Sequence, residues 1–226
     1  MLRALLLFAL PVAAAELPAA VDLSAQWVDG PRRQHDLNSC HAFAAVALIE
    51  AAHYRRTGRH VRLSEADLFV QRMVLRDRES GFLLRDLRIG LERGVAAGDW
   101  YELMRARYKA GVGKDELLPE AAGAPRVTVE GQAETMPHVP ITCIGRQRRR
   151  DHIMRLLAEG VPVGVGVLLE RMREPFSSRG GPHYFVLTGY ETTPSGVIFK
   201  ARNTWEINPD VRESDLCALF ATTWLR

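Results

Sequence analysis

Cys40 is the residue of this chain whose position best suits nucleophilic chemistry. It follows a polar turn at residues 36–39, and the mostly small or apolar residues 42–51 have the spacing of a buried helix. A thiol at the N-terminus of a helix is stabilised as the thiolate by the helix dipole, and the thiolate is the nucleophilic form. The pattern predicts a reactive cysteine, although a cysteine that simply packs in an alanine-rich helix shows the same pattern.

Helical patterns dominate the first half of the chain and would position this cysteine. The polar turn supplies Asp, Asn and Ser, which favour the first position of a helix. We expect helices from Ser39 to Arg56, from Ser64 onward and from after Gly81 to Gly94, with a short helix at 116–122. Residues 95–140 otherwise show no clear pattern.

Short strands dominate the second half. We expect a helix at 151–158 and strands at 161–169, 184–187 and 197–200, the last two separated by a turn at 194–196. Helices in the first half and strands in the second predict an α+β protein with two lobes and a cleft between them.

The composition is that of an ordinary globular protein. The 226 residues are 47% hydrophobic and 25% charged, with a formal net charge of +3. So small an excess of positive charge does not require a nucleic-acid partner, and we interpret the basic run at 146–150 as a solvated loop face. The spacing of the histidines and cysteines matches no metal site, so we expect neither metal nor cofactor.

Residues 1–15 have the features of a secretion signal. Arg3 supplies the positive charge, residues 4–12 the apolar middle and residues 13–15 the small side chains of a cleavage site. The apolar part is too short to span a bilayer, so we expect an exported protein without stable membrane insertion. Besides Cys40 there are two further cysteines, Cys143 and Cys217, and the sequence leaves open whether they pair.

Five short blocks occur in a fixed order along the chain. They are Gln34, Cys-His-Ala-Phe at 40–43, Leu-Ser-Glu-Ala-Asp-Leu at 63–68, Pro-His-Tyr-Phe-Val-Leu-Thr-Gly-Tyr at 182–190 and Asn-Thr-Trp at 203–205. With these blocks the chain resembles the papain-like cysteine peptidases over about residues 21–205. The resemblance implies the two-lobed papain-like fold in residues 16–226, with a helical lobe at about 36–122 and a sheet lobe at about 123–226.

The resemblance also implies a role for each matching residue. It makes Cys40 the nucleophile, His183 the base, Asn203 the group that orients the imidazole, Gln34 a donor of the oxyanion hole, Trp205 a shield of the His–Asn bond and Gly81 a partner of the substrate backbone. Acyl transfer needs this set: a nucleophile, an oriented base, and oxyanion donors typically worth ~3–4 kcal/mol each. An imidazolium beside a helix-terminal thiol lowers the thiol pKa, so we expect a resting thiolate–imidazolium pair.

The choice of base rests on the neighbours of His183. Gly180, Gly181 and Pro182 before it allow close approach, and the apolar residues 185–187 after it form a strand that would position the ring. His152 is the other histidine of note in the second half, and it lacks these features.

The chain departs from the family pattern at three places. His41 stands where the family usually has a Trp, and this second imidazole either tunes the thiolate or fills the volume. Leu37 replaces a half-cystine. Few residues lie between the predicted leader and the start of the domain at 21–22, so we expect a separate protein inhibitor, or action where no restraint is needed.

We therefore predict an exported cysteine peptidase that hydrolyses peptide bonds of a polypeptide substrate through an acyl-thioester on Cys40. Two other functions stay open. One is an acyl transferase on the same fold, in which an amine takes the place of water. The other is a binding module that keeps the cleft without catalysis.

Overall fold

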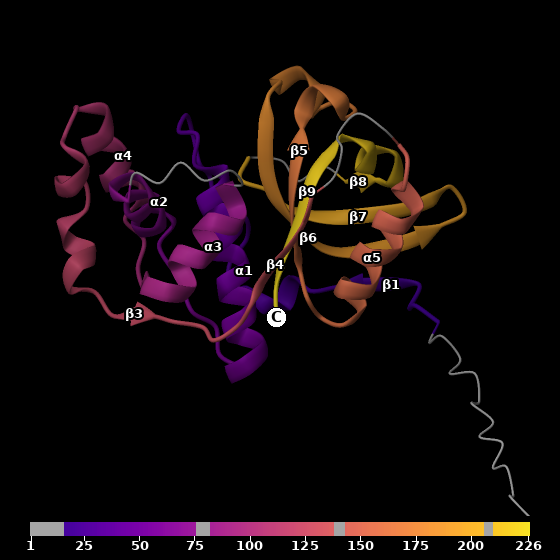
Figure 1. Ribbon diagram of the computed structural model, residues 1–226, viewed down its shortest axis with the longest axis horizontal. Coiled ribbons are helices and arrows are strands. Elements are labelled where there is room, and N and C mark those ends of the chain that lie inside the picture. Colours follow the sequence, from indigo (N-terminus) through magenta and orange to yellow (C-terminus); the bar gives the residue numbers. More distant parts are fainter. Residues whose placement is uncertain (1–15, 76–81, 138–142, 206–209) are drawn as a thin grey trace, which may run out of the picture.

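The computed structural model describes residues 16–75, 82–137, 143–205 and 210–226. Figure 1 shows helices α1 to α4 gathered on one side of the molecule and an antiparallel sheet on the other. This arrangement confirms the α+β class and the two-lobed fold expected from the sequence.

Helices α1 to α4 come from the first half of the chain, and α5 comes from the second. The α-helices are α1 (Cys40–Thr57), α2 (Glu65–Val74), α3 (Phe82–Arg93), α4 (Tyr101–Lys109) and α5 (Arg146–Ala158). Short 3-10 helices are η1 (Ser24–Gln26), η2 (Lys114–Glu116), η3 (Pro119–Gly123), η4 (Leu169–Arg171), η5 (Ser177–Arg179) and η6 (Glu213–Ala218).

Helix α1 carries Cys40 as its first residue and runs between the two lobes. Gly58 ends it with a φ of 67°, a left-handed conformation that a side chain would strain. Residues 40–52 are all buried, because one side of α1 packs with α2 and α4 and another packs on the sheet. Although α1 is apolar, none of the described helices is long and apolar enough to cross a membrane.

The serines in front of α1 and α2 make different contacts. Ser64 caps α2 as predicted, since its hydroxyl accepts the backbone N–H of Asp67 at 3.1 Å. The Ser39 side chain makes no capping bond; its fully buried hydroxyl lies 2.6 Å from the Tyr101 hydroxyl on α4. The expectation of a capping side chain was therefore wrong for Ser39, because a tertiary partner takes its hydroxyl.

The sheet is antiparallel and runs in the order β4-β9-β5-β6-β7-β8, with β1 added beside β6. A separate pair joins β2 to β3. The register places His183 of β6 opposite Val167 of β5. Gly164 of β5 packs so close to the helices that an added Cβ would lie 2.6 Å from Leu83 and 3.0 Å from Leu48. The strands are β1 (Ala20–Asp22), β2 (Val95–Ala96), β3 (Arg126–Val127), β4 (Ala133–Pro137), β5 (Val163–Leu168), β6 (Pro182–Thr193), β7 (Gly196–Arg202), β8 (Val211–Arg212) and β9 (Leu219–Leu225).

The basic run at 146–150 is not a loop. It forms the first turns of α5, which begins after Gly145 in a left-handed conformation. The run tolerates helix formation because Arg150 bonds Asp151 at 2.8 Å and Glu213 at 3.3 Å. The prediction of a loop was therefore wrong, since the compensating Glu213 comes from a segment far away in the sequence.

The chain crosses from the helical lobe to the sheet lobe slightly beyond residue 123. The strand β3 pairs with β2, which follows α3, and so stays with the helices. The next strand, β4, pairs with β9 in the sheet. The chain therefore enters the sheet between Val127 and Ala133.

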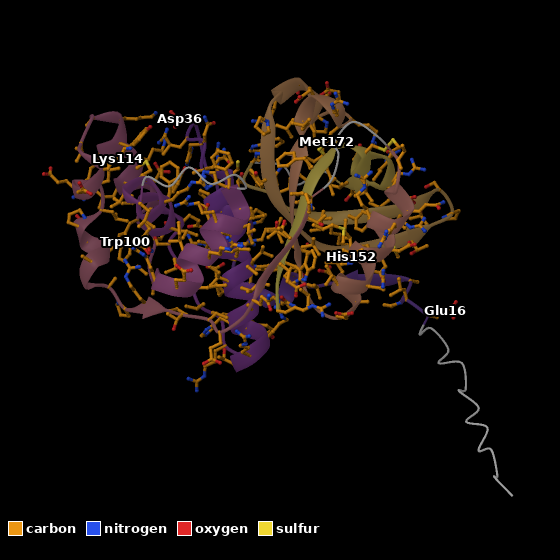
Figure 2. All side chains as sticks on the ribbon, viewed as in Figure 1. Glu16, Asp36, Trp100, Lys114, His152 and Met172 are labelled. Carbon is orange, nitrogen blue, oxygen red and sulfur yellow. A yellow bond between two sulfur atoms is a disulfide. The ribbon has the colours of Figure 1, made fainter. Side chains whose placement is uncertain are left out.

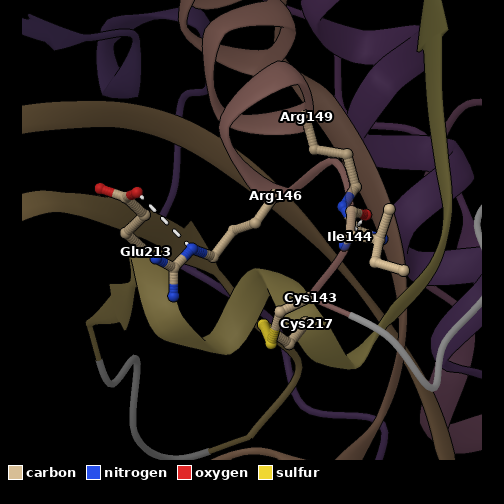
Figure 3. Close-up of a disulfide and its surroundings, with 6 residues drawn as sticks. All are labelled: Cys143, Ile144, Arg146, Arg149, Glu213 and Cys217. Atoms are coloured by element: carbon tan, nitrogen blue, oxygen red, sulfur yellow. Dashed lines mark hydrogen bonds and ion pairs between the residues drawn. A yellow bond between two sulfur atoms is a disulfide. The ribbon is translucent and has the colours of Figure 1, made fainter.

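A disulfide joins Cys143 to Cys217, which settles the pairing that the sequence left open. It ties the segment before α5 to the 3-10 helix η6, across a sequence separation of 74 (Figure 3). Beside it, Arg146 reaches toward Glu213 at 3.7 Å. A cross-link of this kind typically stabilises a protein by about 2 to 4 kcal/mol, because it restricts the unfolded chain.

Candidate active site

The Cys40 thiol lies at the wall of a cavity between the helices and the sheet. The side chain is 8% exposed, and the cavity has a volume of about 810 Å³. Aromatic and aliphatic side chains form most of its lining, which includes Phe82, Leu83, Tyr184 and Phe220. The thiol is therefore not sealed inside the core, and a ligand in the cavity can reach it.

The sulfur of α1 meets the start of strand β6. The backbone amide of Tyr184 lies close enough to the Cys40 sulfur to favour its thiolate form, and Tyr184 directly follows His183. The packing of α1 on β6 thus brings Cys40 to the part of the strand that begins with His183 and Tyr184.

The His183 ring is held on two sides. Its Nε2 lies 2.8 Å from Asn203 Oδ1, and the Trp205 ring stacks on it with centroids 4.3 Å apart and planes inclined by 23°. Asn203 Oδ1 also accepts the Thr204 N–H at 2.7 Å, so this oxygen is an acceptor and Nε2 donates the proton. His183 Nδ1 is then left as the basic nitrogen, which is the tautomer that a general base requires.

Gln34 is fixed by residues of both lobes. Its Oε1 accepts the Thr204 hydroxyl at 2.5 Å, and its Nε2 donates to the Leu37 carbonyl at 3.0 Å. The Tyr101 hydroxyl donates to its backbone carbonyl at 2.7 Å. One of the two N–H groups of the amide is used in this way, and the other can serve a substrate oxygen.

Thr204 and Tyr101 hold Gln34 in place by hydrogen bonds, and neither residue was expected from the sequence. Thr204 connects Gln34 to the Asn203–His183 pair, and Tyr101 connects Gln34 to the N-terminus of α1 through Ser39. Thr204 lies inside the Asn-Thr-Trp block, so this block could have indicated it. Tyr101 begins α4, in a region where no clear pattern is present in the sequence.

His41 belongs to a buried charged group next to the nucleophile. Its Nδ1 lies 2.5 Å from Asp86 Oδ2, and the other oxygen of this fully buried carboxylate accepts a bond from Arg72 at 2.9 Å. The His41 ring also packs near Phe82, with centroids 5.4 Å apart. The second imidazole therefore has its own carboxylate partner and forms part of the cavity wall.

Burial shifts the two reacting groups away from their charged forms. Burial raises the pKa of the Cys40 thiol, while hydrogen bonds from the backbone amides of Tyr184 and His41 act in the opposite direction. Burial lowers the pKa of His183 to about 4, and the nearby positive charge of Arg179 adds to the effect. Burial thus disfavours the thiolate–imidazolium pair that the sequence led us to expect, because both charges would be removed from water.

The lowered pKa of His183 makes a prediction for the pH dependence of activity. The base must be neutral to accept a proton, so kcat/KM should hold as the pH falls from 7 to 5 and drop as it passes through about 4. A profile of kcat/KM between pH 3 and 8 on one peptide measures this. An acid limb near 6.5, the ordinary value for histidine, would show that His183 is not shielded from water.

Gly81, Trp205 and His152 are the other residues that were singled out in the sequence. Gly81 lies outside the described residues, and Trp205 stacks on His183 as described above. His152 lies on α5, where its ring packs against Trp224 with centroids 4.8 Å apart (Figure 2). Within the described part of the chain, no group of three or more His, Cys, Asp or Glu side chains is placed to hold a metal ion.

The two-lobed fold, with a cysteine at the head of the interlobe helix and a His–Asn pair on the sheet, is that of the papain class of cysteine proteases. The sequence pattern described as papain family cysteine protease matches residues 17–208. The chain belongs to this family, which confirms the resemblance seen in the sequence. No curated protein matches the chain in sequence.

Solved structures show the same fold at low sequence identity. The proform of Amb a 11, a cysteine protease and major ragweed pollen allergen, is 18% identical, with a TM-score of 0.62 over 95% of this chain and 60% of that chain. Procathepsin L 3 of the Tenebrio molitor larval midgut is 14% identical, with a TM-score of 0.66 over 94% of this chain and 71% of the other. Recombinant stem bromelain precursor is 17% identical, with a TM-score of 0.60 over 92% of this chain and 70% of that chain. The chain thus spans well under the full length of these precursors.

Proposed function

We propose that this protein is a peptidase that cleaves polypeptides through a thioester on Cys40. The observation that supports this most is the position of Cys40: its sulfur lines an open cavity and contacts the residue next to His183. The base itself is oriented by Asn203 and covered by Trp205.

In the proposed reaction, the Cys40 sulfur attacks the carbonyl carbon of the scissile peptide while its proton passes to His183 Nδ1. The carbonyl oxygen becomes an oxyanion, which the backbone amide of Cys40 and the Gln34 amide bind. Collapse of the tetrahedral intermediate breaks the C–N bond, and His183 gives the proton to the leaving amine. Water then attacks the thioester with His183 as base, which releases the carboxylic acid and restores the thiol.

The lining of the cavity indicates which substrates fit. Its large volume and the aromatic residues Phe82, Tyr184 and Phe220 favour a bulky apolar side chain in the acyl part of the substrate. We therefore propose a polypeptide substrate with such a residue close before the scissile bond.

We also propose that the protein acts after export. The pattern of residues 1–15 supports this, and so does the disulfide between Cys143 and Cys217, because disulfides persist mainly in oxidising compartments.

The test of the proposed function uses the single free thiol. Since Cys143 and Cys217 are paired, a peptidyl epoxide should label the native protein once, at Cys40, and should not label the Cys40→Ala variant. Native Cys40 should react faster than free cysteine at pH 6, because His183, whose lowered pKa keeps it neutral at this pH, takes the thiol proton as the sulfur attacks. Intact mass and labelling rate measure both points.

A peptide-library digest then separates the remaining functions. Wild-type protein should cut peptides, and Cys40→Ala should not. Products that carry an added amine instead of water at the new carboxyl end would indicate acyl transfer. If Cys40 is labelled only after denaturation and no peptide is cleaved, the protein is a binding module without catalysis.

A further inference from the structure

The Trp205 ring packs against two planar groups, the His183 ring and the Arg179 guanidinium. The guanidinium carbon of Arg179 lies 4.5 Å from the centroid of the Trp205 ring, and the His183 centroid lies 4.3 Å from it. The Trp205 ring therefore contacts a buried imidazole and an exposed guanidinium, and the three side chains form a stack with His183 on the inside and Arg179 on the outside.

Arg179 is exposed, and its guanidinium makes no hydrogen bond or ion pair with the described residues. This is unlike Arg173 of the same connecting segment, which bonds Asp215 at 2.8 Å. Stacking on Trp205 fixes the plane of the guanidinium and leaves its N–H edge open, which is the edge that binds carboxylates in a forked geometry. Its charge is close enough to His183 to contribute to the lowering of that residue's pKa.

The stack lies on the side of the site where the leaving part of a substrate must be. His183 and Tyr184 are consecutive residues of β6, so their side chains point to opposite faces of the strand. Tyr184 faces the cavity, whereas His183 faces Trp205. Because His183 hands its proton to the departing amine, the residues after the scissile bond pass over His183 toward Trp205 and Arg179.

We propose that Arg179 is a specificity-determining residue that binds a carboxylate in the leaving part of the substrate. This carboxylate is either an acidic side chain in the first or second residue after the scissile bond or the free carboxyl end of a short peptide. The inference rests on the proposed peptidase function and adds to it a charge preference that the apolar cavity cannot supply.

The experiment compares kcat/KM for internally quenched peptides with identical acyl halves. The first leaving residue is Glu, Gln or Lys, and a parallel set ends at this residue as a free acid or as an amide. The variants are Arg179→Gln and Arg179→Glu. Arg171→Gln is the matched control, since Arg171 is an exposed arginine of the same connecting segment and its loss removes the same charge.

Wild-type protein should cleave the Glu peptide roughly 5- to 10-fold faster than the Gln peptide, which corresponds to about 1 to 1.4 kcal/mol. Arg179→Gln should lose this ratio, Arg179→Glu should prefer Lys, and Arg171→Gln should behave as wild type. A preference for the free acid over the amide identifies the carboxyl end as the ligand, and a Glu preference in both sets identifies the side chain. Equal rates for all wild-type substrates, or equal losses in Arg171→Gln and Arg179→Gln, would overturn the proposal.

A binding measurement separates failure of this proposal from failure of the peptidase function. Cys40→Ala protein is titrated with the same peptides, followed by fluorescence anisotropy, with and without the Arg179→Gln change. If wild type cleaves nothing but Cys40→Ala still binds Glu peptides more tightly through Arg179, the peptidase function is wrong and the carboxylate site stands. If binding shows no charge preference either, both proposals are overturned.

Discussion

Replacing Gln34 with alanine is expected to lower kcat roughly 100- to 1,000-fold with little change in KM. A donor aimed at the developing oxyanion stabilises the transition state by about 3 to 4 kcal/mol and contributes little to ground-state binding. The fold should survive, because the backbone of Gln34 makes its own bonds to Thr204 and Tyr101. Steady-state kinetics with one good peptide substrate and circular dichroism of both proteins measure these points.

Two further variants identify which atom of Gln34 matters. Gln34→Glu keeps the shape but replaces the amide donor with an acceptor, so it should lose as much activity as Gln34→Ala. Thr204→Val removes the hydroxyl that bonds Oε1 but leaves the donor in place, and its loss should be smaller. If Gln34→Ala lost less than about fivefold, which is close to 1 kcal/mol, Gln34 would be a loop residue rather than an oxyanion donor.

Replacing Arg32 with methionine is expected to lower the free energy of unfolding by about 3 to 5 kcal/mol. Arg32 bonds Glu50 at 2.8 Å and also pairs with Glu65, and both carboxylates are almost completely buried. Burial works against the Arg32 charge, but the attraction of Glu65 and Glu50 outweighs it and raises the Arg32 pKa. Without Arg32, two buried carboxylates would share one site without the cation that bonds both of them.

The destabilisation should depend on pH in a defined direction. Burial raises the pKa of Glu50 from its ordinary value of 4.5 to about 7, and Arg32 limits this rise. Between these values the folded state holds the proton more strongly than the unfolded state, so stability falls as the pH rises from 4.5 through 7. Without Arg32 the rise is larger, and Arg32→Met should therefore cost more at pH 8 than at pH 5.

Urea unfolding at both pH values measures the effect. Arg107→Met is the matched control, because Arg107 pairs with Glu120 at 2.6 Å on the surface, where water screens the charges. The triple variant Arg32→Met, Glu50→Gln, Glu65→Gln should recover part of the loss, since it removes the uncompensated charges. An Arg32→Met variant no less stable than Arg107→Met would show that the buried pairs carry no net stability.

This ion network also affects the site. Asp29 accepts bonds from Arg32 at 3.1 Å and from Arg202 at 3.0 Å, and Arg202 directly precedes Asn203. Arg32 in turn lies two residues before Gln34. These ion pairs thus connect the segment that bears Gln34 to the strand end that precedes Asn203, across the two lobes.

The sequence by itself determined the elements and residues whose signals are local. The start and end of α1, the cap of α2 at Ser64 and the apolar strands β5 and β7 follow from side-chain pattern and turn residues within a few positions. The order of the five blocks determined the family, and with it the expected partners of Cys40.

Tertiary structure decided the features that depend on contacts between residues far apart in the sequence. The pairing of Cys143 with Cys217, the helical state of residues 146–150 and the Tyr101–Ser39 contact all need groups brought together from separate segments. The direction of the pKa shifts of Cys40 and His183 was also decided there, because burial disfavours each charge and only the packed lobes define that burial. The Arg179–Trp205–His183 stack belongs to the same group, since no spacing in the sequence shows which faces of two rings will meet.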